Sequence, residues 1–175
     1  MKNELIFSGV GGQGIMLIGK ILCTVSAEKG YNVTFAPTYG QEKRGGRTSC
    51  QMVISDTVES PVISEAGLVL VMDESSLVDF EDRVKEGSYL IINSSMIEKE
   101  STKKDINIIK IPINDIAREI ENTRSANFVA LGVALKYIDI LSFEDINNYI
   151  ERTFEDNVAE SNKVAFARGY NYGKI

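Results

Sequence analysis

A glycine-rich turn constrains the fold of this chain more than any other feature of its sequence. Residues 9–14 read Gly-Val-Gly-Gly-Gln-Gly and contain the pattern G-x-G-x-x-G. The turn follows an apolar run at 5–8 and precedes a segment at 15–29, whose apolar side chains recur at helical spacing until Gly30. A strand, a glycine turn and a helix in this order are typical of an α/β fold in which the turn follows a buried strand.

The remaining pattern continues this alternation. We expect further strands at 32–35, 50–55, 68–72, 89–92 and 106–111, and helices at about 113–121, 127–140, 143–154 and 157–168. The fold class is therefore α/β: a Rossmann-like, open, mostly parallel sheet with helices on both faces and a helical C-terminal third. A length of 175 residues suits one domain with one core, so residues 1–175 are expected to form a single domain.

Several residues are expected to begin or end these elements. Ser142 and Asp145 have the spacing of a capping box at the start of a helix. We expect Pro37 to stop the second strand and Gly169 to end the last helix. After the strand at 68–72 we expect a helix with Leu77, Phe80 and Val84 on one face and Gly87 as its stop.

The composition excludes several kinds of chemistry. The chain has no histidine and only two cysteines, Cys23 and Cys50. Ser-His-Asp or Cys-His catalysis and imidazole zinc sites are therefore impossible within it. An iron–sulfur cluster needs four ligands, so two thiols cannot hold one, and we expect both to be buried. With no signal-peptide pattern and no apolar run long enough for a bilayer, the expected location is cytoplasmic, away from membranes.

The charge is distributed unevenly along the chain. The formal net charge is −6, which argues against nucleic-acid binding by the molecule as a whole. Residues 1–50 contain six Lys or Arg residues against three Glu residues, a net charge of +3. A basic N-terminal segment within an acidic chain predicts a small anionic ligand close to the glycine turn.

The glycine turn itself is a candidate phosphate site. Its candidate binding residues are Gly9, Gly11, Gly12, Gln13 and Gly14. We expect the N–H groups of Gly11, Gly12 and Gly14 to face a phosphate at the positive end of the following helix. The acid that binds the ribose of NAD is missing after the second strand, and no Gly-Lys-Ser/Thr follows the turn. NAD and a P-loop are therefore both disfavoured.

Residues 37–49 lack any periodicity and hold three glycines and three cations, which predicts a long loop at the same edge of the sheet. Its candidate binding residues are Tyr39, Glu42, Arg44, Gly45, Gly46 and Arg47. Two arginines offer planar pairs of donors for phosphate, and the glycines permit close approach. The alternative is a solvated loop in which Glu42 pairs with Arg44 or Arg47.

Together the two segments carry a family resemblance. The run GVGGQGI, Lys20 in the first predicted helix, and PTYGQEKRGGRTSCQMVIS resemble the gamma subunit of 2-oxoacid:ferredoxin oxidoreductases. In that family a G-x-G-G-Q-G loop precedes a Tyr-Gly-x-Glu-x-Arg-Gly-Gly loop. Asn127, in the run Ser-Ala-Asn-Phe-Val-Ala-Leu-Gly, resembles the family's Asn…Leu-Gly helix start. The likeness extends over nearly the whole chain.

The resemblance implies a subunit of an enzyme complex. Such complexes convert a 2-oxoacid and coenzyme A into acyl-CoA, carbon dioxide and reduced ferredoxin. Thiamine diphosphate and the iron–sulfur clusters belong to other subunits, so the implied partners are thiamine-binding and ferredoxin-like subunits. This chain would contain no catalytic or metal-ligating residue, would be inactive alone, and would contact coenzyme A or a partner. The substrate stays open between pyruvate, 2-oxoglutarate, branched-chain and aryl 2-oxoacids.

Two other functions remain open at this point. One is a stand-alone NADP-dependent reductase in which Arg44 or Arg47 takes the 2′-phosphate. The other is a structural subunit whose glycine turn packs against a partner and binds no ligand.

The acids between residues 73 and 86 are expected to form a solvated helix face: Asp73, Glu74, Asp79, Glu81, Asp82 and Glu86.

Overall fold

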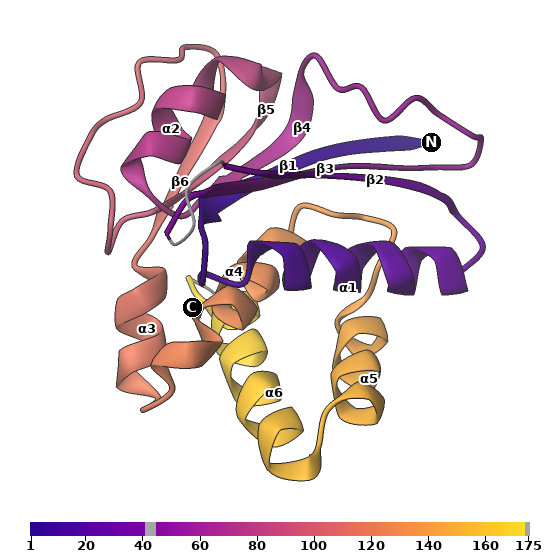
Figure 1. Ribbon diagram of the computed structural model, residues 1–175, viewed down its shortest axis with the longest axis vertical. Helices are drawn as coiled ribbons and strands as arrows, with labels where there is room; N and C mark the ends of the chain where they lie inside the picture. Colours follow the sequence, from indigo (N-terminus) through magenta and orange to yellow (C-terminus); the bar gives the residue numbers. More distant parts are fainter. Residues whose placement is uncertain (41–44, 174–175) are drawn as a thin grey trace.

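A six-stranded sheet forms the centre of the computed structural model, which describes residues 1–40 and 45–173 (Figure 1). The strand order is β2-β3-β1-β4-β5-β6. The strands are β1 (Lys2–Val10), β2 (Asn32–Tyr39), β3 (Arg47–Ser55), β4 (Ala66–Val71), β5 (Val84–Asn93) and β6 (Asn107–Ile111). Strands β1, β4, β5 and β6 pair in parallel, whereas β3 is antiparallel to both β1 and β2. The expected mostly parallel sheet is confirmed, with β3 as the reversed strand.

Helices cover both faces of this sheet. They are α1 (Ile15–Glu28), α2 (Glu74–Phe80), α3 (Ile113–Glu119), α4 (Ala126–Leu135), α5 (Phe143–Thr153) and α6 (Asp156–Asn171), with short 3₁₀ turns η1 (Glu81–Arg83) and η2 (Thr123–Ser125). Figure 1 shows α1, α4, α5 and α6 on one side of the sheet and α2 on the other. The helical C-terminal third is confirmed. None of the helices in the described part of the chain is both long and apolar enough to cross a membrane.

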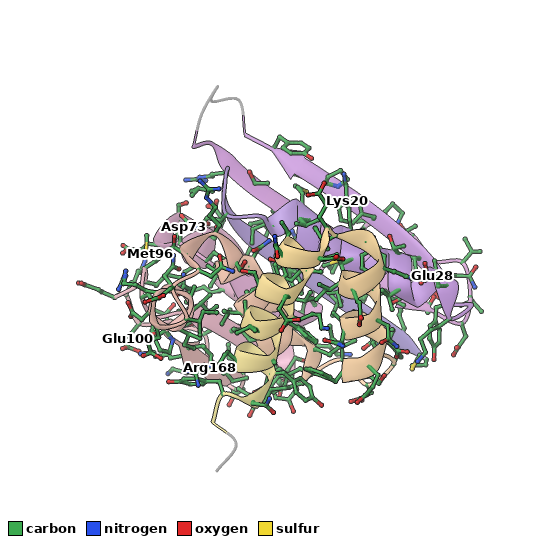
Figure 2. The ribbon with its side chains drawn as sticks, turned by 90° about the horizontal axis from the view of Figure 1, so that it is seen from below. Lys20, Glu28, Asp73, Met96, Glu100 and Arg168 are labelled. Carbon is green, nitrogen blue, oxygen red and sulfur yellow. The ribbon has the colours of Figure 1, made fainter. Side chains whose placement is uncertain are left out.

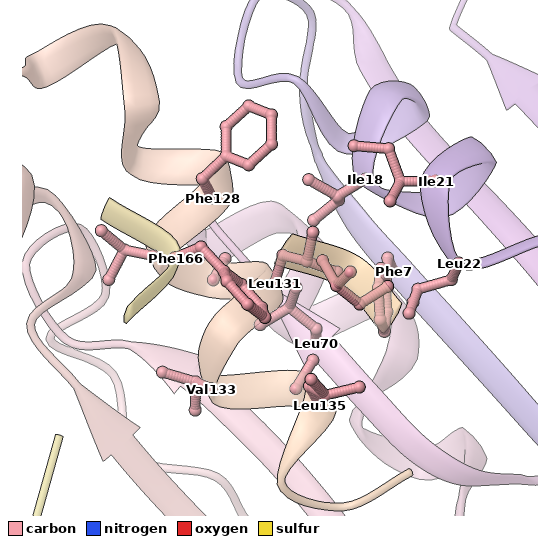
Figure 3. Packing of buried hydrophobic residues seen from close by; sticks show 14 of the residues in the cluster. Phe7, Ile18, Ile21, Leu22, Leu70, Phe128, Leu131, Val133, Leu135 and Phe166 are labelled. Atoms are coloured by element: carbon pink, nitrogen blue, oxygen red, sulfur yellow. The ribbon is translucent and has the colours of Figure 1, made fainter. Parts of the chain in front are cut away.

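The larger core lies between the sheet and the C-terminal helices. Phe7 of β1 and Leu70 of β4 are fully buried and belong to one cluster with apolar side chains of α1 and α4. Figure 3 shows Leu131 of α4 between these strand residues and Phe166 of α6. Burial of such large apolar side chains stabilises the fold by about 1.5–3 kcal/mol each. Because α4 is buried almost all round, it is the central helix of this layer.

Pro37 does not stop the second strand. Strand β2 continues to Tyr39, and Pro37 pairs with Cys50 of β3. Because β2 is an edge strand, the absent N–H of proline need not break the sheet. Residues 37–49 are therefore not one long loop: their two ends are the paired strands of a β2–β3 hairpin.

The helix expected after β4 is shorter than its pattern suggests. Helix α2 ends at Phe80, and Val84 begins β5, in which Gly87 adopts a positive φ of 75°. Leu77 and Val84 are buried in the same cluster under the second face of the sheet, although they belong to a helix and a strand. Because both side chains are buried against the same face of the sheet, their spacing in the sequence resembled that of one continuous helix.

The acids at 73–86 do not form one solvated face. Asp73 caps α2 by accepting from the Ser75 N–H at 3.1 Å. Glu81 is buried and accepts hydrogen bonds from Ser101 Oγ at 2.6 Å and Thr102 N at 2.8 Å. Burial alone would raise the pKa of Glu81, but these hydrogen bonds lower it on balance. Glu81 therefore anchors the connection between β5 and β6.

Two helix boundaries were expected in the C-terminal third: the start of α5 at Ser142 is confirmed, and the end of α6 at Gly169 is wrong. Ser142 and Asp145 form the capping box, since Asp145 N donates to Ser142 Oγ and Ser142 N to Asp145 Oδ2. Gly169, in contrast, lies inside α6 and not at its end. A Cβ atom there would overlap the backbone of Val129 in α4, so this glycine permits close packing of two helices.

Both cysteines are buried, as expected, and burial raises the pKa of each thiol to about 12. Because the thiolate is the nucleophile, neither Cys23 nor Cys50 should react with iodoacetamide at pH 8 in the folded chain. Mass spectrometry should show two added groups only when the same reaction is run in denaturant. Rapid labelling of the native chain would contradict this burial.

Candidate functional site

Positive φ angles shape the glycine turn. Gly12 has a φ of 97°, and Gly14, the N-cap residue of α1, has a φ of 73°. Side chains of L-residues rarely adopt such angles. At Gly9, a Cβ atom would lie 3.0 Å from Ile15 Cγ1 and overlap the side-chain amide of Gln13. Glycine is therefore required at these positions by the backbone and by close packing.

Gln13 closes the turn from inside. The side-chain Oε1 of Gln13 accepts a hydrogen bond from Val10 N at 2.8 Å, and the backbone N–H of Gln13 donates to the Val10 carbonyl at 3.1 Å. The side-chain Nε2 lies 3.5 Å from the Met72 carbonyl oxygen. The amide thus joins the end of β1 to the end of β4. Gln13 was predicted to bind a ligand, and in this structure its side chain holds the turn in shape.

The glycine turn and the basic segment meet, as the sequence predicts. The Gly11 N–H donates to the Gly46 carbonyl at 2.7 Å, and Arg47 pairs with Val10 where β3 begins. Gly45, with a φ of 65°, lies beside them. A hydrogen bond between backbones therefore joins two segments more than 30 positions apart in the sequence.

The meeting of the two segments changes which donors remain free. The Gly11 N–H is used by Gly46 and cannot bind a phosphate unless that hydrogen bond breaks. The N–H groups of Gly12 and Gly14 make no hydrogen bond to any residue that the structure describes. Helix α1 follows with no acidic residue in its first turn and no side-chain cap. An anion here would meet the two free N–H groups and the positive end of a 14-residue helix.

Arg47 has a partner that the sequence did not indicate. Its Nη1 lies 2.6 Å from Asp79 Oδ2 of α2, although 60% of the arginine side chain stays exposed. Nothing in the local pattern links two residues on different elements, so Asp79 was assigned to a solvated face. Arg44 and Glu42 lie outside the described residues. The other predicted residue, Tyr39, is 64% exposed at the end of β2.

Polar side chains at the ends of β1, β4 and β5 are already hydrogen-bonded among themselves. Ser8 Oγ donates to Ser76 Oγ at 2.9 Å, and Ser76 Oγ donates to Asp73. Asn93 donates to the Met72 carbonyl at 3.1 Å and to Asn114 Oδ1 at 2.7 Å. Figure 2 shows Asp73 at this edge of the molecule. Within residues 1–40 and 45–173 there is no cluster of three potential His, Cys, Asp or Glu metal ligands.

The topology argues against a nicotinamide dinucleotide. In that fold, the strand beside β1 runs parallel to it and ends with the acid that binds the ribose. Here the neighbour on that side is β3, which runs in the opposite direction, so Arg47 at its start lies beside the turn. The place of a ribose-binding carboxylate is therefore taken by a cation.

A further residue near the turn was noted in the sequence only through the family resemblance. Asn127, in the first turn of α4, is 5% exposed and packs against Gly14, where a Cβ atom would lie 2.8 Å from Asn127 Cγ. Its buried Oδ1 atom has no hydrogen-bond partner among the described residues. An asparagine at a helix start is common at caps, so the sequence alone could not separate this buried amide from a cap.

Comparisons with known proteins agree with this architecture. The pyruvate ferredoxin/flavodoxin oxidoreductase family matches residues 4–172. The 2-oxoglutarate synthase subunit KorC of Methanocaldococcus jannaschii is 30% identical over 178 residues, covering 99% of this chain and 95% of that protein. The gamma subunit of a keto/oxoacid ferredoxin oxidoreductase from Geobacter sulfurreducens PCA superimposes with a TM-score of 0.85 and 25% identity, covering 98% and 95% of the two chains. A 2-oxoglutarate:ferredoxin oxidoreductase from Magnetococcus marinus, solved with 2-oxoglutarate, coenzyme A and succinyl-CoA bound, has a TM-score of 0.88 at 22% identity. This chain covers 30% of that longer one.

Proposed function

Because the chain belongs to the pyruvate ferredoxin/flavodoxin oxidoreductase family, we propose that it is the gamma subunit of a 2-oxoacid:ferredoxin oxidoreductase complex. In this complex it would contribute a phosphate-binding element for coenzyme A. The relatives named as subunits support the assembly, and the Magnetococcus protein of the same fold binds coenzyme A. Thiamine diphosphate and iron–sulfur clusters would belong to the other subunits. The composition of this chain supports that assignment for the iron–sulfur clusters, because its two buried thiols cannot supply four ligands.

One observation carries the phosphate role: the hydrogen bond from Gly11 to Gly46. It holds Gly46, at the end of the basic segment, against the turn, where the N–H groups of Gly12 and Gly14 have no hydrogen-bond partner among the described residues. Coenzyme A has several phosphate charges and needs no ribose-binding acid, which suits a basic segment where such an acid is missing.

Each residue of the site then has a distinct task. Gly12 and Gly14 donate to phosphate oxygens at the N-terminus of α1, and Arg44 and Arg47 neutralise the remaining negative charge. Glu42 orients one guanidinium. Arg47 must exchange Asp79 for the phosphate, so part of the energy of its new contact offsets the broken ion pair.

The same edge of the molecule suits a partner subunit. Tyr39, Val78 of α2 and Met96 after β5 are all more than half exposed, which is unusual for large apolar side chains. Figure 2 shows Met96 on the same side as Asp73. We propose that this apolar edge packs against the thiamine-binding subunit and places the bound coenzyme A at the interface.

Co-expression with the other subunits tests the assembly. The chain should co-purify with a thiamine-binding subunit and a ferredoxin-like subunit, and the complex should reduce ferredoxin when given a 2-oxoacid and coenzyme A. The chain purified alone should contain neither iron nor thiamine and should show no turnover. A chain that binds none of the subunits, or that reduces NADP by itself, would overturn the proposal.

A further inference from the structure

A cavity of about 380 Å³ lies at the edge of the sheet opposite the glycine turn, where β1 begins. Figure 1 shows this start of β1, marked N, at the other end of the sheet from the start of α1. The walls of the cavity, which we call the notch, come from residues 2–5 of β1, 67–68 of β4 and 85–89 of β5, together with Tyr137 just after α4. Its volume lies within the range of about 300–1,000 Å³ that is usual for small-molecule sites.

The notch exists because β4 is shorter than the strands on either side of it. The ladder between β1 and β4 begins at Leu5, so residues 2–4 extend past the start of β4. On the other side, residues 85–88 of β5 have only Gly67 of β4 opposite them, because the register shifts between these two strands. Such a bulge redirects side chains and is frequent beside functional sites.

The bulge at 85–88 is held in place from β6 and from the turn before it. The Gly87 N–H donates to the Asp105 carbonyl at 2.7 Å, and Asn107 Nδ2 donates to the Gly87 carbonyl at 2.8 Å. Asp105 itself has a φ of 59°, which is uncommon for a residue other than glycine. Backbone of this kind persists where the surrounding structure fixes it, so this wall of the notch is formed before any ligand binds.

Two tyrosine rings form the aromatic side of the notch. The ring centroids of Tyr89 and Tyr137 lie 4.5 Å apart, with 39° between the ring planes. Neither hydroxyl hydrogen-bonds to a residue that the structure describes. Burial, and to a smaller extent Tyr89, raises the pKa of Tyr137, so its hydroxyl remains a donor at neutral pH. The buried side chains of Leu5 and Leu68 add aliphatic surface, and together these groups suit an aromatic ring.

Charges of both signs stand on the bulge. Lys85 and Glu86 line the notch, are exposed, and form no ion pair with a described residue. Lys2 and Glu4, on the facing strand, pair with each other at 2.9 Å. The charges that line the notch therefore sum to zero and leave one cation and one anion for a ligand. Charge complementarity then favours a molecule that is neutral as a whole but carries both a carboxylate and an ammonium group.

We propose that the notch binds an α-amino acid with an aromatic side chain. The carboxylate of the amino acid lies at Lys85, its ammonium group at Glu86, and its ring against Tyr89 and Tyr137. A 2-oxoacid lacks the ammonium group, so the notch distinguishes an amino acid from the substrate class of the complex. This site is independent of the phosphate role, because the notch and the glycine turn lie at opposite ends of β1.

Three matched probes test the recognition of both charges. L-phenylalanine has both groups, phenethylamine lacks the carboxylate, and 3-phenylpropanoate lacks the ammonium group. Titrated into the labelled 175-residue chain, phenylalanine should shift the resonances of Gly67, Tyr89 and Tyr137 in a saturable manner. Each single-charge probe should bind about fivefold more weakly. If phenylalanine leaves these resonances unchanged, or if either single-charge probe binds as tightly, the proposal is overturned.

Two variants and a control test the individual charges. Lys85→Gln and Glu86→Gln should each weaken phenylalanine binding about fivefold, and neither should unfold the chain because both side chains are exposed. Lys85→Gln should leave phenethylamine binding unchanged, since that probe has no carboxylate. Lys20→Gln, at an exposed position on α1 outside the notch, should change neither. If Lys85→Gln weakens phenethylamine as much as phenylalanine, or if neither notch variant has an effect, the proposal fails.

Discussion

Replacing Gly169 by alanine is expected to lower the free energy of unfolding by at least about 2 kcal/mol. A Cβ atom at Gly169 would lie 2.8 Å from the Val129 carbonyl carbon and closer still to its oxygen. On the facing helix, a Cβ at Gly132 would lie 2.6 Å from Tyr170 N and overlap the Phe166 carbonyl. These neighbours are backbone atoms, so no side-chain rotation can relieve the overlap and the two helices must move apart.

The sign of this effect is decided by two opposing terms. Alanine is favoured over glycine inside a helix by about 1 kcal/mol. That gain is smaller than the loss expected when α4 and α6 separate, because α4 is the central buried helix. Urea unfolding followed by circular dichroism measures the difference. Gly67→Ala is the control, since its Cβ would meet only the Glu4 carbonyl at 3.7 Å. Equal stability of the Gly169 and Gly67 variants would contradict this packing.

Replacing Arg44 and Arg47 together by alanine is expected to raise the Michaelis constant for coenzyme A at least tenfold in the assembled complex. Each charge-assisted contact is typically worth about 1.5–3 kcal/mol. The contribution of Arg47 is reduced because its ion pair with Asp79 must first break. A tenfold change corresponds to about 1.4 kcal/mol, a floor that allows for this loss.

A variant that is expected to lower the Michaelis constant for coenzyme A provides a second test. Asp79→Asn should release Arg47 and lower the Michaelis constant for coenzyme A severalfold, because a negative charge beside the phosphate site is removed. The matched control is the Arg118→Ala, Arg168→Ala double variant, whose arginines pair with Asp115 and Glu119 elsewhere on the surface. An unchanged constant in an intact Arg44, Arg47 variant would mean that the segment serves only the subunit interface.

Features that depend on neighbouring residues could be predicted from the sequence. The strand, turn and helix around residues 9–14 follow from local patterns, and so does the capping box of Ser142 and Asp145. The sequence also predicted that the glycine turn and the basic segment open at the same edge of the sheet, which follows from the general geometry of parallel strands and not from neighbouring residues. Two segments that follow parallel strands open at the same edge of a sheet, and the hydrogen bond from Gly11 confirms it.

Features that depend on tertiary packing could not be predicted from the sequence. Pro37 was expected to stop a strand, but the edge position of β2 makes it tolerable, and strand order is not visible in a local pattern. Gly169 was expected to end a helix, but it marks a close crossing with α4. The pairing of Arg47 with Asp79 and the buried amide of Asn127 likewise arise from elements that meet only after folding.

A crystal structure of the assembled complex with coenzyme A tests the central claim most directly. The account predicts phosphate oxygens of coenzyme A within about 3.2 Å of the N–H nitrogens of Gly12 and Gly14. It also predicts that Arg47 turns away from Asp79 toward the ligand, while the hydrogen bond from Gly11 to Gly46 is kept. Coenzyme A whose phosphates are held entirely by other subunits, with Gly12 and Gly14 facing protein or solvent, would contradict it.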